Sequence, residues 1–145
     1  MNKAKTTITT LLFVFAAAIA NAAPISKDEQ TNIAVDGYDL IGFFAESSAI
    51  KGNPQIRTIH NDTVYFFASE ANKSKFENNP EKYLPAYGGY CAFGASIGTL
   101  LPVDIDTWEI VDGKLVFQYN HEIRELFNKD SKNNFAKADA YWGTL

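Results

Sequence analysis

The sequence predicts an α+β domain in which two β-hairpin-plus-helix units form a small antiparallel sheet with helices packed on it. Three observations lead to this prediction. The chain has 145 residues, a length typical of one domain. Its composition, 46% hydrophobic and 21% charged, is that of a globular protein with a core. An order of apolar run, turn, apolar run and helix also occurs twice along the chain.

The N-terminus has the pattern of a secretory signal peptide. Lys3 and Lys5 precede an apolar stretch over 8–20, and a small-x-small cleavage pattern ends at Ala22. The apolar stretch is shorter than the roughly 20 residues that a membrane span requires. We therefore expect a signal peptide over 1–22, a polar leader over 23–33 and one domain over 34–145. The product is expected to be periplasmic or secreted, with no membrane attachment after cleavage.

The first hairpin-plus-helix unit is expected between residues 55 and 78. Asn61 and Asp62 separate two apolar-rich runs, and the second run, 63–67, consists of β-branched and aromatic residues that favour a strand. Ser69 follows directly and is a preferred residue for the N-cap of a helix. The segment therefore predicts strand, turn, strand and helix in that order.

The second unit repeats this order at an offset of 51 residues without a gap. Its strands are expected within 108–119, around Asp112 and Gly113, a pair that favours a tight hairpin turn. Asn120 is expected to cap the following helix, and a third helix is expected over 133–142. Because an isolated hairpin is only marginally stable, we expect the two units to join their strands.

The charge and the cysteine count exclude several classes of function. The formal net charge is −4, which argues against a nucleic-acid partner or an anionic membrane surface. The chain has one cysteine, Cys91, so it can form neither an internal disulfide nor a four-cysteine zinc site.

The candidate binding site is the segment that connects the two units. Tyr87, Gly88, Gly89, Tyr90 and Cys91 combine flexible backbone, aromatic rings and the only thiol of the chain. A ligand crevice is expected between the units, so Tyr87 and Tyr90 are the predicted contacts for a small molecule.

A metal ion, copper or zinc, is the other ligand that these residues suggest. The metal ligands would be Cys91, His121 and His60, the last two being the only histidines of the chain. The ends of the units that carry the histidines meet if the units pack head to tail and stay apart if they pack side by side. Three ligands make an open site rather than a closed structural one.

Residues 65–83 resemble the core signature of the YHS-domain family, in which an aromatic strand runs into a helix that ends in Asn-Pro-Glu-Lys-Tyr, here Asn79 to Tyr83. Residues 37–44 resemble the Asp-Pro-Val segment of the family. Residues 88–92 and 110–115 resemble the corresponding segments of family members that carry signal peptides. The resemblance covers most of 34–142. It implies a YHS-like fold and the heavy-metal handling with which cysteines of this family are associated.

The residues that bind metal in the family are replaced in this chain. Gly42, Ala68 and Asn72 stand where the family pattern has cysteine, and Phe66 stands where it has histidine. The resemblance therefore supports the fold and leaves Cys91 as the only sulfur ligand, outside the matched metal motif.

Three functions follow from these observations. The first is a non-enzymatic exported module that binds a metal ion or small ligand near Tyr90 and Cys91. The second is a protein–protein interaction or homodimerisation module in which Cys91 is buried. The third is a thiol-dependent enzyme in which Cys91 is unusually reactive.

Overall fold

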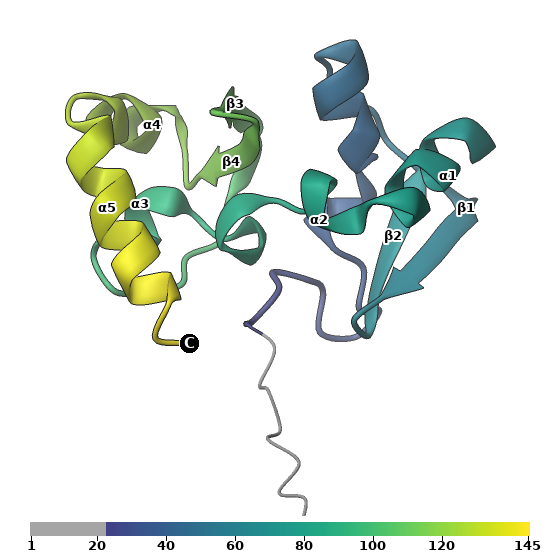
Figure 1. Ribbon diagram of the computed structural model, residues 1–145, viewed down its shortest axis with the longest axis horizontal. Coiled ribbons are helices and arrows are strands. Elements are labelled where there is room, and N and C mark those ends of the chain that lie inside the picture. Colours follow the sequence, from purple (N-terminus) through teal and green to yellow (C-terminus); the bar gives the residue numbers. More distant parts are fainter. Residues whose placement is uncertain (1–22) are drawn as a thin grey trace, which may run out of the picture.

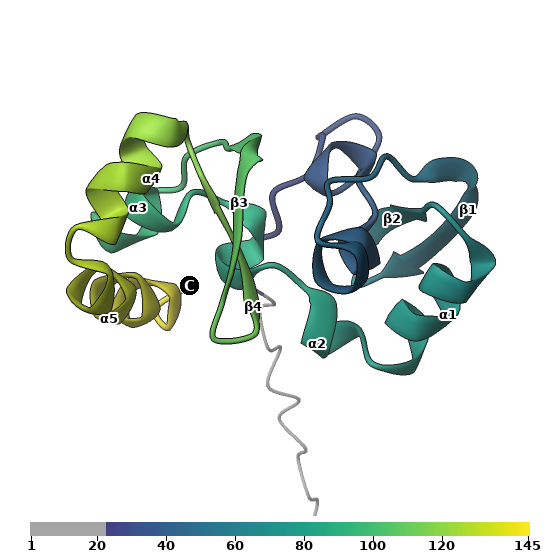
Figure 2. The same ribbon diagram turned by 90° about the horizontal axis from the view of Figure 1, so that it is seen from above.

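The computed structural model describes residues 23–145, so the predicted signal peptide over 1–22 lies outside the described residues. Two hairpins, each with helices beside it, form the two halves of the molecule (Figures 1 and 2). In chain order the strands and α-helices are β1 (Asn53–His60), β2 (Thr63–Phe67), α1 (Glu70–Asn78), α2 (Pro80–Tyr83), α3 (Ala92–Ser96), β3 (Asp104–Val111), β4 (Lys114–Gln118), α4 (His121–Asn128) and α5 (Ser131–Trp142). Among the described residues, no helix is both long and apolar enough to span a bilayer.

The two predicted hairpin-plus-helix units are confirmed. Strands β3 and β4 begin 51 residues after β1 and β2, as the sequence offset requires. The helix caps also correspond: the Ser69 side chain accepts a hydrogen bond from Asn72 N at 3.1 Å, and the Asn120 side chain accepts one from Ile123 N at 2.8 Å. Each cap satisfies a backbone N–H that has no partner within its helix.

Both hairpin turns use left-handed backbone at two successive residues. Asn61 and Asp62 have φ values of 48° and 57°, and Asp112 and Gly113 have 49° and 76°. Such turns match the twist of the adjoining strands, and Asn, Asp and Gly are the residues that tolerate them. Each hairpin is therefore closed by a two-residue turn of the same kind.

The expectation that the hairpins join in one sheet is wrong, since β1–β2 and β3–β4 are separate two-stranded sheets. Other parts of the chain pair with one edge of each hairpin. Ile33 forms a parallel bridge to Val64 in β2, and Cys91 forms one to Phe117 in β4. The end of the predicted polar leader is therefore paired with the first hairpin rather than free of the fold.

Phe43 connects the two halves through the core. Its ring lies 5.6 Å from that of Phe117 in an edge-to-face arrangement and 5.3 Å from that of Trp108. Strand β4 is buried on both faces, because Leu115 and Phe117 belong to this cluster whereas Val116 belongs to a second one formed with α3, α4 and α5. A strand that lies between two clusters holds the halves in a fixed relation.

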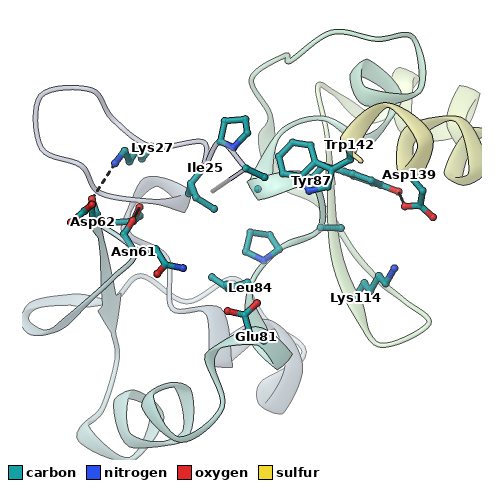
Figure 3. A pocket seen from close by; sticks show the side chains of 16 residues that line it. Ile25, Lys27, Asn61, Asp62, Glu81, Leu84, Tyr87, Lys114, Asp139 and Trp142 are labelled. Carbon is teal, nitrogen blue, oxygen red and sulfur yellow. Dashed lines mark hydrogen bonds between the residues drawn. The ribbon is translucent and has the colours of Figure 1, made fainter. Parts of the chain in front are cut away.

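The predicted C-terminal helix lies within α5, which begins at Ser131. Ala138 on its inner face is fully buried, and Phe135 packs edge-to-face on Phe127 of α4 at 4.8 Å. The last residue of the helix, Trp142, reaches the space between the halves (Figure 3).

Candidate functional site

An open cleft of about 710 Å³ lies between the two halves (Figure 3). Its walls come from the first described residues, the β1–β2 turn, the segment from α2 to Gly88, the start of β4 and the end of α5. The lining residues are Ala23, Pro24, Ile25, Lys27, Asn61, Asp62, Thr63, Glu81, Leu84, Pro85, Ala86, Tyr87, Gly88, Lys114, Asp139 and Trp142. The crevice expected between the units is therefore present.

One wall of the cleft is the segment 23–27, which we call the N-terminal strap. Ser26 N donates to Gly88 O at 2.8 Å, and Lys27 Nζ donates to Asp62 O at 3.1 Å (Figure 3). The strap is thus bonded to the second half at one point and to the first half at the other. It lies across the space between the halves and fixes one side of the cleft.

Gly88 allows the strap to lie this close. Its φ is +59°, and a Cβ at this position would lie 2.1 Å from Pro24 O and 3.0 Å from Trp142 Cη2. Only glycine avoids both overlaps and adopts this backbone without a steric cost.

Tyr87, one of the two predicted ligand contacts, does line the cleft. It has left-handed backbone (φ 53°, ψ 36°), which costs a non-glycine residue about 1–2 kcal/mol. Its hydroxyl donates to Asp139 Oδ1 at 2.9 Å, and its ring lies edge-to-face on Trp142 at 6.0 Å. Burial raises the pKa of Tyr87, and the bond to Asp139 and the charge of that carboxylate raise it further. Tyr87 is therefore a neutral hydrogen-bond donor at ordinary pH.

Tyr90, the other predicted contact, lies away from the cleft lining. Its hydroxyl is 3.5 Å from Ile25 O, to which it donates a weak hydrogen bond. Tyr90 therefore supports the N-terminal strap from behind rather than facing a ligand in the cleft.

Cys91 is fully buried and its sulfur is engaged in three hydrogen bonds. Sγ donates to Gln118 Oε1 at 3.3 Å and accepts from Gly94 N at 3.4 Å and from Tyr119 N at 3.3 Å. Gln118 is also buried, and its Nε2 has no partner among the described residues. The thiol thus caps α3 and anchors β4 from inside the core.

The structure does not gather the three predicted metal ligands into one site. His60, on β1, lies 3.4 Å from Glu81 and packs edge-to-face on Phe76, whereas His121 is exposed at the start of α4. Within residues 23–145, no three histidine, cysteine, aspartate or glutamate side chains form a group that could hold a metal ion. The units pack so that the histidines and Cys91 stay apart.

The three positions at which the YHS pattern has cysteine surround one buried carboxylate, that of Asp39. Ala68 N and Asn72 Nδ2 each donate to Asp39 Oδ2 at 2.8 Å, and Ile41 N donates to Oδ1 at 2.9 Å. Gly42 N donates to the backbone oxygen of Asp39 at 3.1 Å. Every oxygen of the Asp39 carboxylate is satisfied, so this cluster is a structural anchor that ties residues 39–42 to β2 and α1.

Sequence reasoning did not identify the charged residues of the cleft. Glu81, Lys114 and Asp139 come from three different elements and meet only after the halves have packed. Trp142 falls within the predicted third helix, but a helical pattern alone does not say which neighbour lies opposite the ring.

Comparison with models of known protein families, with curated proteins and with solved structures finds no match for this chain. The functional argument therefore depends on the geometry of the chain itself.

Proposed function

We propose that this chain is an exported, non-enzymatic, YHS-like module that binds a small organic ligand in the cleft between its two halves. The observation that carries the proposal is the cleft itself, about 710 Å³ in volume, with Tyr87 strained at its edge. A volume of this size is typical of clefts that hold small molecules.

The backbone at the cleft favours a binding role. Tyr87, Gly88 and Gly89 have φ values of 53°, 59° and 86°, so three successive residues adopt left-handed backbone. Tyr87 is the non-glycine residue among them and is therefore strained, and strained residues are concentrated at functional sites, where the surrounding structure maintains the strain. Here the strain places the Tyr87 ring against Trp142 and lets the N-terminal strap approach Gly88.

The composition of the lining favours an organic ligand over a metal ion. Pro24, Ile25, Leu84 and Pro85 provide apolar surface, and charged side chains of both signs are placed around it. Sites for small molecules combine a mainly apolar wall with a few polar groups that orient the ligand. Copper or zinc near Cys91 is less favoured, because the sulfur is buried and already engaged by Gln118 and two backbone N–H groups.

The environment of Cys91 also disfavours the thiol-enzyme alternative. A catalytic thiol needs a base within hydrogen-bond reach and access to a substrate. Among the described residues, the side chain bonded to Cys91 is that of Gln118, an amide that does not act as a base.

A nuclear magnetic resonance titration of the ¹⁵N-labelled protein with a panel of small metabolites tests the binding proposal. We expect at least one compound to shift the backbone signals of Tyr87 and Gly88 together with the indole signal of Trp142. Zinc and copper(I) are titrated in parallel as probes of the metal alternative.

A matched pair of variants locates the binding. Ala86→Phe adds bulk inside the cleft and should weaken the binding, whereas Ala136→Phe adds the same bulk at an exposed position of α5 and should leave it unchanged. If no compound moves the cleft signals, or if the shifts centre on Cys91 and Tyr119 upon metal addition, the proposal is wrong. Export is checked separately by expressing the full chain and sequencing the N-terminus of the product, which is expected to begin at Ala23.

A further inference from the structure

Tyr87 and Trp142 form a preformed aromatic wall at one end of the cleft (Figure 3). Their rings are edge-to-face, with centroids 6.0 Å apart and planes at 78°. Trp142 also packs directly over Gly88, where an added Cβ would lie 3.0 Å from its ring. Both rings are therefore held in place before any ligand arrives, and a preorganised site loses less entropy on binding.

Acidic side chains predominate in the same cleft. Asp62, Glu81 and Asp139 line it from three different elements, against two lysines. Three carboxylates and two lysines give the lining a net charge of −1, which favours a positive ligand over a negative one.

Asp139 places its negative charge next to the aromatic wall. Oδ1 accepts the hydroxyl hydrogen of Tyr87 at 2.9 Å, which fixes the carboxylate beside the ring. Asp139 is exposed and lines the cleft, so its carboxylate stays accessible to a ligand there. The partly exposed Trp142 ring and this carboxylate are the two features that attract a cation, and Tyr87, which is only 5% exposed, contacts both of them.

We propose that the cleft binds a small organic cation, an ammonium group that carries methyl substituents, against the Trp142 ring with Asp139 as its counter-charge, both of them positioned by Tyr87. This inference rests on the binding function proposed above and names the class of ligand. A methylated ammonium is weakly hydrated and needs no hydrogen-bond acceptors, so aromatic faces and apolar neighbours such as Ile25 and Leu84 suit it.

The experiment compares choline with its neutral tert-butyl analogue, in which carbon replaces the charged nitrogen. The two molecules have the same shape, so the difference in their affinity measures the charge alone. We expect choline to shift the Trp142 indole signal and to bind about tenfold more tightly than the analogue, a ratio in the range of a cation–π contact.

Two variants separate the aromatic and the electrostatic contributions. Trp142→Leu should weaken choline binding about tenfold. Trp142 also packs on Gly88, so its replacement could disturb the fold, and Asp139→Asn serves as a second variant. The asparagine amide oxygen still accepts a hydrogen bond from Tyr87, but the negative charge is gone. Choline affinity should therefore fall several-fold. Asp130→Asn removes one charge at the other end of α5, outside the cleft, and should leave choline affinity unchanged.

The outcomes distinguish this inference from the proposed function. If panel compounds bind in the cleft but choline binds no better than its analogue, the cation inference is overturned and the binding function stands. If Asp139→Asn and Asp130→Asn weaken choline equally, binding reflects net charge rather than this site, and the inference is also overturned. If no compound of any class moves the cleft signals, both proposals fail.

Discussion

Cys91 Sγ donates a hydrogen bond to Gln118 Oε1 across 3.3 Å, and both side chains are buried in the core beside β4. The sulfur also accepts hydrogen bonds from the backbone N–H groups of Gly94 and Tyr119. The single thiol of the chain is thus part of the packing that joins α3 to β4.

This burial predicts that Cys91 resists thiol reagents in the folded protein. Alkylation requires a solvent-accessible thiolate, so the reaction should be slow in buffer and fast after unfolding in denaturant. Ser74→Cys places a second thiol on the exposed side of α1 as an internal control, and that thiol should react at once. Equal rates for both thiols in the folded protein would contradict the buried position of Cys91.

Gly88→Ala is expected to lower the free energy of unfolding by about 2–4 kcal/mol, because the new methyl group overlaps Pro24 O and the backbone keeps a positive φ. Chemical denaturation measures the loss. Gly113→Ala is the matched control, since Gly113 also has a positive φ of 76° but has nothing within 4 Å of the added methyl group. It should cost about 1–2 kcal/mol, from the backbone alone. Equal losses would mean that the contact with the N-terminal strap contributes nothing.

Asp39→Asn is expected to destabilise the fold by about 2–4 kcal/mol. The Asp39 carboxylate accepts three N–H donors, from Ile41, Ala68 and Asn72. An asparagine has one acceptor oxygen, so in either orientation its amide nitrogen faces at least one buried N–H. Asp104→Asn is the control at an exposed position, where the side chain accepts one bond from Asp106 N, and it should change stability by less than about 1 kcal/mol. A loss for Asp39→Asn no larger than for this control would show that Asp39 is not an anchor.

The protein is expected to lose stability at high pH through Tyr65. Burial raises the pKa of Tyr65 from 10.0 to about 12, and the charge of Glu81 adds to the effect. Between these two pH values the unfolded state has released the phenolic proton and the folded state has kept it. Stability is therefore complete below pH 10 and falls as the pH rises towards about 12, by up to about 2–3 kcal/mol.

Urea denaturation at several pH values measures this loss, and Tyr65→Phe should make the decline between pH 10 and 12 shallower. Tyr119→Phe removes a hydroxyl from a half-exposed tyrosine and serves as the control. An unchanged slope in Tyr65→Phe would mean that this side chain keeps its ordinary pKa in the folded state.

The parts of the fold that the sequence could predict are those that depend on nearby residues. Asp112 and Gly113 determine a turn between adjacent strands, and Ser69 and Asn120 cap helices that begin at the next residue. Such signals lie within a few positions of one another, so periodicity and residue preference are sufficient to find them.

The parts that could not be predicted depend on distant residues. The hairpins form separate sheets, and Ile33 and Cys91 bridge to them from elsewhere in the chain. The pairing of Tyr87 with Asp139 and Trp142 likewise depends on how α5 packs against α3 and α4. Tyr87 can be predicted because it lies in an unusual segment of glycine, tyrosine and cysteine, but its partners Asp139 and Trp142 have no such local signal.

The N-terminal strap has a consequence for the order in which the chain folds. Tyr90 bonds to Ile25 from 65 residues away, and Trp142 lies against Gly88 where the strap crosses it. Contacts between residues so distant in sequence close large loops and form late, after the local hairpins and helices. The N-terminal strap therefore settles into place late, after the hairpins and helices that it joins have formed.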